Sequence, residues 1–121
     1  MHSLTRALEH SREKLVLVEG KKDKQALESL GFTNIVSLQN RPLFEVVETI
    51  QEKEVVLLTD LDKEGRRLFS ILKKGLERQG TKVHSQLRFE LLKAGLVHIE
   101  TLTEEWIAHL EDRKNLTLFG K

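Results

Sequence analysis

The sequence predicts an α/β domain with a parallel sheet of about four strands and helices on both faces. Short apolar runs without alternation, at residues 15–18 and 55–59, are typical of strands that are covered on both faces. Segments with apolar residues at helical spacing separate such runs, and the connections between them are short. This alternation favours parallel pairing through right-handed crossovers. A length of 121 residues suits one domain, so we expect residues 1–121 to form a single unit.

The elements follow one another regularly through a core at residues 15–84. We expect strands at 15–18, 34–38, 55–59 and 81–84, and helices at 21–30, around 43–50, and at 63–79. Gly31 and Gly80 stand where the first and third helices would end. Asn40 and Pro42 suit the N-cap and the first turn of the middle helix.

The two ends of the chain carry weaker patterns. Residues 1–13 are expected to form a short lead-in helix. Residues 86–94 and 103–110 have helical patterns, and residues 115–121 are expected to be a strand or a frayed tail. We therefore treat residues 85–121 as a C-terminal extension of the core.

Composition excludes several classes of site. The chain has no cysteine, which excludes disulfides, thiolate zinc sites, iron–sulfur clusters and a cysteine nucleophile. It has no tyrosine, so a phosphotyrosine intermediate cannot form within it. No apolar run approaches the roughly 18 residues of a membrane-spanning helix, and the N-terminal residues lack the apolar stretch of a signal peptide. We expect a cytoplasmic location, no membrane partner, and any metal to be held by oxygen or histidine.

Three carboxylates stand at or just after the ends of two buried-type strands. Glu19 follows the first strand, Asp60 follows the third, and Asp62 lies two residues later in a turn. In open parallel sheets, ligands bind beyond the carboxyl ends of the strands, where the strand order reverses. If the two strands are neighbours, the three side chains face one small volume, and their mutual repulsion favours a divalent cation. Mg²⁺ prefers such oxygen ligands together with substrate phosphate oxygens.

Groups around the same edge suit a phosphate. The helix that begins near Lys63 directs free N–H groups and the positive end of its dipole toward this volume. Lys21, Lys22 and Arg66 are candidates for contacts with a nucleic-acid backbone. The alternative for these basic residues is an ordinary solvated helix face.

Histidine and aromatic residues indicate no second site. The five histidines show no close metal-ligand spacing, so surface or packing roles are expected for most of them. His84 is the exception, because it is expected near the end of the fourth strand. There it would lie at the same edge of the sheet as the three carboxylates, the active edge, and could transfer a proton. Trp106 is expected to pack the last helix onto the core rather than to stack on a base.

Two motifs carry a family resemblance. Val-Glu-Gly at 18–20 and Thr-Asp-Leu-Asp-Lys-Glu-Gly at 59–65, each after an apolar strand, resemble the motifs of the Toprim domain of primases, topoisomerases, ribosomal RNA maturases and related nucleases. The short length is similar to that of small archaeal and bacterial Toprim proteins. The resemblance implies a compact Rossmann-like Toprim fold and a catalytic and metal-binding set of Glu19, Asp60 and Asp62.

In that resemblance, Glu19 would be the general acid or base and would also touch the metal, while Asp60 and Asp62 would hold Mg²⁺. Glu64 matches an acidic position that only some members carry, so no role is assigned to it. A complete topoisomerase or primase needs further parts that are not recognised in this sequence. The metal-assisted phosphoester core is what the motifs indicate.

The residues leave two functions open and disfavour a third. The first is an Mg²⁺-dependent nuclease, or another RNA- or DNA-processing phosphodiesterase or nucleotidyl-transfer enzyme. The second is a non-catalytic module that binds nucleic acid or protein in a larger complex and retains the acidic site. A receiver-like phosphoacceptor is disfavoured, because it carries its acidic pair after the first strand and a lone aspartate after the third. RNA or DNA is the expected partner.

Overall fold

A parallel β-sheet runs through the middle of the structure, a computed structural model that describes the backbone of residues 2–119 and the side chains of residues 3–112. Its strands are β1 (Leu15–Val18), β2 (Ile35–Ser37), β3 (Glu54–Leu57) and β4 (Lys82–His84). The helices are α1 (His2–Ser11), α2 (Lys21–Ser29), α3 (Leu43–Thr49), α4 (Lys63–Arg78), α5 (Gln86–Lys93) and α6 (Glu104–Phe119), with a 3₁₀ turn, η1 (Ile99–Thr101). The α/β class and the parallel sheet predicted from the sequence are confirmed.

The order of the strands is β2-β1-β3-β4, so β1 and β3 are neighbours. Val16 of β1 pairs with Ile35 of β2 on one side and with Val56 of β3 on the other. β4 pairs with β3, and all of these pairings are parallel. The strand order therefore reverses between β1 and β3, and the carboxyl ends of these two strands lie side by side. This is the point at which open α/β sheets bind their ligands.

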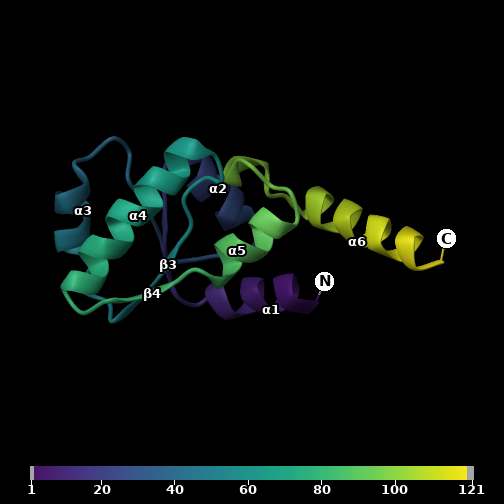
Figure 1. Cartoon of the computed structure of the whole chain (residues 1–121), viewed down its shortest axis with the longest axis horizontal. Coiled ribbons are helices and arrows are strands. Elements are labelled where there is room, and N and C mark those ends of the chain that lie inside the picture. The colour runs from purple at the N-terminus through teal and green to yellow at the C-terminus, as the bar shows by residue number, and fades with distance from the viewer. Residues whose placement is uncertain (1, 120–121) are drawn as a thin grey trace.

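Helices cover both faces of the sheet and form a separate core on each (Figure 1). On the face covered by α1, α2 and α5, the strand segments contribute Val16, Val18, Val56 and Leu58. On the face covered by α3 and α4, they contribute Leu15, Leu17, Val55 and Leu57. Successive residues of β1 and β3 are thus buried on opposite faces, which explains the continuous apolar runs of the sequence.

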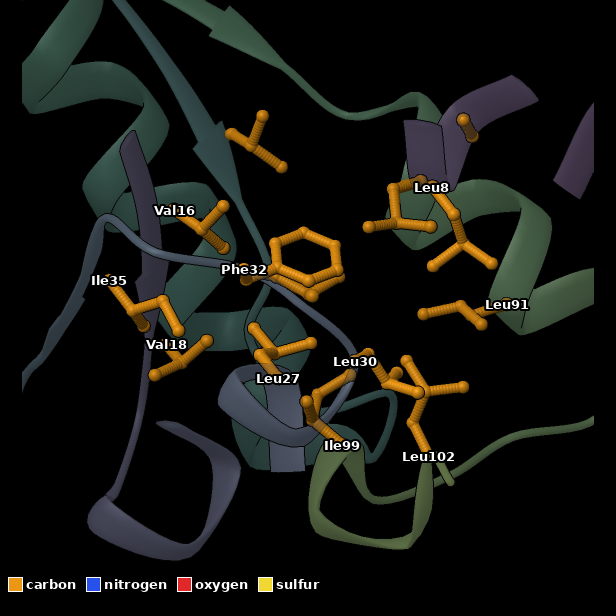
Figure 2. Packing of buried hydrophobic residues seen from close by; sticks show 14 of the residues in the cluster. Leu8, Val16, Val18, Leu27, Leu30, Phe32, Ile35, Leu91, Ile99 and Leu102 are labelled. Carbon is orange, nitrogen blue, oxygen red and sulfur yellow. The ribbon is translucent and has the colours of Figure 1, made fainter. Parts of the chain in front are cut away.

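The residues after β4 pack on the α1 and α2 side of the sheet. Leu91 of α5, Ile99 of η1 and Leu102 are fully buried in the same cluster as Leu27 of α2 (Figure 2). α6 then extends away from the other elements (Figure 1), and Trp106 in its first turn is partly buried against this core. This position agrees with the packing role predicted for Trp106.

Two local expectations were wrong. α6 runs to Phe119, so residues 115–119 are helical rather than a strand or a frayed tail, and residues 120–121 lie outside the described part of the chain. Asn40 is not an N-cap: it has a positive φ of 63° in the turn before α3, and Pro42 occupies the N-cap position. Asparagine tolerates this left-handed backbone, which accounts for its place in the turn. Within residues 2–119, no helix has both the length and the apolar character that crossing a membrane requires.

Candidate metal and active site

The carboxyl ends of β1 and β3 bring Glu19 into contact with the loop that contains Asp60. The backbone N–H of Asp60 donates a hydrogen bond of 2.8 Å to Oε2 of Glu19. This contact follows from the pairing of β1 with β3, in which Leu17 lies opposite Leu57 and its carbonyl accepts from the N–H of Leu58 at 2.9 Å. Two segments that are far apart in the sequence thus meet at one edge of the sheet.

The first turn of α4 fixes Asp62. Asp62 is the N-cap of α4, and its Oδ1 accepts a hydrogen bond of 2.7 Å from the N–H of Gly65. The hydroxyl of Thr59 donates to the carbonyl of Gly65 at 2.7 Å. A Cβ atom added to Gly65 would lie 1.9 Å from the carbonyl oxygen of Asp60. Only glycine therefore permits this approach of α4 to the loop.

The segment between α5 and η1 holds the same loop from its other side. The N–H of Ile99 donates to Oδ1 of Asp60 at 2.8 Å. The N–H of Leu61 donates to the carbonyl of Val97 at 2.7 Å. These two hydrogen bonds flank His98 and attach its backbone to the loop.

Arg88 of α5 adds a charged contact to this loop. Its guanidinium donates to the carbonyl of Thr59 at 3.1 Å and to that of Asp60 at 2.8 Å. The same group lies over the ring of Phe69, with Cζ 4.7 Å from the ring centroid. Burial lowers the pKa of Arg88, while the negative charges of Glu19 and Asp60 act in the opposite direction. Arginine keeps its charge even so, and Arg88 fixes the loop as a cation.

His98 places an imidazole nitrogen beside the two aspartates. Its Nδ1 lies 3.8 Å from Oδ2 of Asp60 and 3.7 Å from Oδ2 of Asp62. Among the described side chains, these three residues form a group whose ligand atoms all lie within 4.8 Å of one another. Since Oδ1 of each aspartate accepts from a backbone N–H, Oδ2 of each is the oxygen that faces His98. Two carboxylates and an imidazole form a donor set that fits a divalent metal ion.

Negative charge accumulates around this group. Burial raises the pKa of Glu19, the hydrogen bond from Asp60 opposes this shift, and repulsion from Asp60, Asp62 and Asp23 adds to it. Asp23 is 5% exposed, and burial followed by repulsion from Asp60 raises its pKa as well. Oδ2 of Asp23 accepts from the N–H of Gly20 at 3.1 Å, which fixes the turn after Glu19. A bound cation would relieve this repulsion.

The predicted nucleic-acid-binding residues lie around the same edge. Lys21 and Lys22 are exposed in the first turn of α2 and, with Glu19 and Asp60, line an open cleft of about 370 Å³. Arg66 is exposed in the first turns of α4, and its positive charge helps to lower the pKa of Arg88. The structure thus places all three basic residues near the acidic group.

His84 lies away from this edge, contrary to expectation. β4 is three residues long and ends opposite Val56, before β3 ends. Nε2 of His84 lies 2.6 Å from Oε1 of Glu54, the first residue of β3 and therefore at the opposite end of that strand from Asp60. The prediction that His84 serves the active edge is wrong, because the short β4 stops too early.

Comparison with known proteins identifies the family. The sequence model of the Toprim domain family matches residues 13–85 of this chain. The chain belongs to the Toprim family. The match includes Glu19, Asp60 and Asp62, as the sequence motifs predict, and it ends before Arg88 and His98.

Relatives and a solved structure support this assignment. A UPF0292 protein from Methanocaldococcus jannaschii is 32% identical over 99 residues, covering 76% of this Toprim chain and 77% of the relative. A UPF0292 protein from Pyrococcus abyssi is 36% identical over 105 residues, covering 85% and 74% of the two chains. The solved structure of a protein from Aquifex aeolicus superposes with a TM-score of 0.74 at 34% identity, covering 84% of this chain and 95% of that one.

Proposed function

We propose that this Toprim protein is a metal-dependent phosphodiesterase that cleaves RNA or DNA, with Asp60 and Asp62 as metal ligands and Glu19 as general acid or base. The observation that carries the proposal is the 2.8 Å hydrogen bond from the Asp60 N–H to Glu19, which holds a titratable carboxylate beside the two aspartates. The proposed metal is Mg²⁺, the ion that the family resemblance implies.

The two aspartates are oriented for the role of ligands. Each gives Oδ1 to a backbone N–H and directs Oδ2 toward the other residues of the group. When bound, the metal ion supplies positive charge that stabilises charge developing on phosphate oxygens. The protein positions the aspartates before any substrate arrives, so little reorganisation is needed.

Glu19 has the environment of a proton-transfer group. Its Oε2 accepts from Asp60, and its other oxygen remains for exchange of a proton with a substrate oxygen or a water. Its raised pKa brings the carboxyl closer to neutral pH, where proton transfer in both directions is most efficient. Among the described residues, Glu19 lies outside the group of ligand atoms that Asp60, Asp62 and His98 form, so we assign it to proton transfer rather than to metal binding.

The surroundings favour a polyanionic substrate. The cleft beside Glu19 is open and is lined by Lys21 and Lys22 together with four carboxylates, whose negative charge a bound metal ion would offset. α4 is 16 residues long and begins directly after Asp62, so its N-terminal dipole also favours phosphate near the aspartates. An open cleft with basic side chains suits the backbone of a nucleic acid.

The test is a cleavage screen of structured and single-stranded RNAs and DNAs with added Mg²⁺. Asp60→Asn and Asp62→Asn should each lower cleavage about 100-fold or more and be partly rescued by more metal, whereas Glu19→Gln should lower turnover by about 10²- to 10⁴-fold at saturating metal. Glu48→Gln, an exposed change on α3, is the control and should have no effect.

Full activity of Glu19→Gln at saturating metal would overturn the acid–base role. Cleavage that survives complete chelation would overturn the metal mechanism. Metal-dependent binding of nucleic acid without cleavage of any substrate would support the non-catalytic module instead.

A further inference from the structure

We infer that His98 is a direct ligand of the metal held by Asp60 and Asp62, and that this nitrogen strengthens the binding of Mn²⁺ more than that of Mg²⁺. The inference rests on the metal site of the proposed function. It adds a ligand from outside the residues that the Toprim model matches, which end at residue 85.

The distances fit a shared ion. Two ligand atoms that are each about 2.1 Å from one metal ion lie roughly 3.0 Å apart at a right angle and roughly 4.2 Å apart on opposite sides of it. Nδ1 of His98 lies 3.8 Å from Oδ2 of Asp60 and 3.7 Å from Oδ2 of Asp62, within that range for both pairs. The ligand atoms of Asp60 and Asp62 lie within 4.8 Å of each other, so at most a small shift of these side chains brings all three ligand atoms onto one ion.

The backbone holds His98 in this place. The residue before it, Val97, accepts a hydrogen bond from Leu61, and the residue after it, Ile99, donates one to Asp60. The segment that orients Asp60 thus also delivers the imidazole. The His98 side chain is 53% exposed, so packing into the core does not account for its position.

The chemistry of the ligand atoms determines which ion is bound more strongly. Mg²⁺ prefers oxygen ligands and gives up its water reluctantly, whereas first-row transition ions accept imidazole readily. A nitrogen ligand added to two carboxylates therefore strengthens the binding of Mn²⁺ more than that of Mg²⁺.

A second arrangement of the same atoms is an ion pair between protonated His98 and the two aspartates. In that arrangement His98 competes with the metal, so its removal would strengthen the binding of both ions. The two arrangements predict opposite results for the same variant.

The experiment measures the affinity of the full-length protein for Mn²⁺ and for Mg²⁺ by titration calorimetry. His98→Asn should weaken Mn²⁺ binding about tenfold or more and Mg²⁺ binding less than about threefold. His109→Asn, an exposed histidine of α6, is the matched control and should change neither affinity. His98→Gln is a second variant in case the first does not fold.

Pulsed electron paramagnetic resonance of the Mn²⁺ complex gives a readout that does not depend on activity. A nitrogen hyperfine coupling should be present in the wild type and in His109→Asn and be lost in His98→Asn. The inference would be overturned by the lack of this coupling in the wild type, by equal losses for both ions, or by tighter binding of both.

These outcomes are separate from those of the proposed function. Nitrogen coupling in a protein that cleaves nothing would support the ligand role of His98 and contradict the phosphodiesterase. Metal-dependent cleavage without nitrogen coupling would support the phosphodiesterase and contradict the ligand role.

Discussion

The two parts of the candidate site differ in how their residues reach it. Residues 18–20 and 59–65 lie at the ends of adjacent strands, so their positions follow from the local chain and the strand order. Arg88 and Ile99 reach the same loop across separations of 28 and 39 residues. The first part carries the carboxylates of the proposed chemistry, and the second part fixes where they point. The motifs of the first part are enough to identify the site, but the orientation of its carboxylates depends on both parts.

Gly65→Ala tests the first part and should have the largest effect. A methyl group 1.9 Å from the Asp60 carbonyl oxygen forces the loop and α4 apart. We expect the free energy of unfolding to fall by about 3 kcal/mol or more. Chemical denaturation provides the measurement.

The matched control is Gly75→Ala in the same helix. There a Cβ atom would lie 3.4 Å from a methyl group of Val47, and alanine favours the helix by about 1 kcal/mol, so a change within about 1 kcal/mol is expected. Equal stability of the two alanine variants would contradict the close approach at Gly65.

Arg88→Met tests the second part. Methionine keeps an apolar side chain beside Phe69 but removes the donors to the carbonyls of Thr59 and Asp60. We expect a loss of about 1.5–3 kcal/mol of unfolding free energy, the range for charged hydrogen bonds. The same substitution at Arg67, whose ion pair with Glu64 is exposed and screened by solvent, should lower the free energy of unfolding much less. A loss at Arg88 no larger than that at Arg67 would show that the second part does not hold the loop.

Glu19→Gln tests the electrostatic cost of bringing the carboxylates together. The pKa of Glu19 is higher in the folded protein than in the unfolded chain, so the folded state binds its proton more tightly and stability falls as pH rises through this raised pKa. Glutamine keeps an oxygen for the Asp60 N–H and removes the charge. Without metal at neutral pH, the variant should be more stable by less than about 1 kcal/mol, because Glu19 is only partly buried.

This gain should disappear below the ordinary pKa of a glutamate, where Glu19 is protonated in both states. Denaturation curves at neutral and acidic pH provide the measurement, with Glu48→Gln as an exposed control. A variant that is less stable than the wild type at neutral pH without metal would contradict the repulsion.

The smallest expected effect concerns the basic residues around the cleft and the salt dependence of nucleic-acid binding. Replacing Lys21, Lys22 and Arg66 by alanine should reduce the slope of log affinity against log salt by up to about 0.9 per lost phosphate contact with duplex nucleic acid. Lys53→Ala with Lys82→Ala, at the amino ends of β3 and β4, is the control and should leave the slope unchanged. An unchanged slope in the triple variant would assign the three residues to a solvated helix face.

Local sequence patterns predicted the fold class and the residues that the strand ends bring together, but not the contacts that depend on packing between distant elements. The apolar runs before Glu19 and Asp60 identify buried strands, and parallel pairing then places both residues at one edge. His84 was misplaced because the length of β4 depends on its pairing with β3. Arg88 and His98 carry no local signal, since their approach to the loop depends on how α5 and η1 pack in the core. The chemical roles proposed for the carboxylates stay predictions.

In each aspartate, Oδ1 accepts a backbone hydrogen bond and Oδ2 faces His98. These separate roles determine how an asparagine would fit at either position. An asparagine side chain has one acceptor, and the N–H of Gly65 or of Ile99 requires that acceptor at Oδ1. The amide can then fit in one orientation only, with its NH₂ group directed where Oδ2 faces His98. Asp60→Asn and Asp62→Asn would therefore keep the loop intact while presenting hydrogen-bond donors to any cation. Such variants separate the architecture of the loop from its charge, and the expected result is a folded protein that binds metal much more weakly.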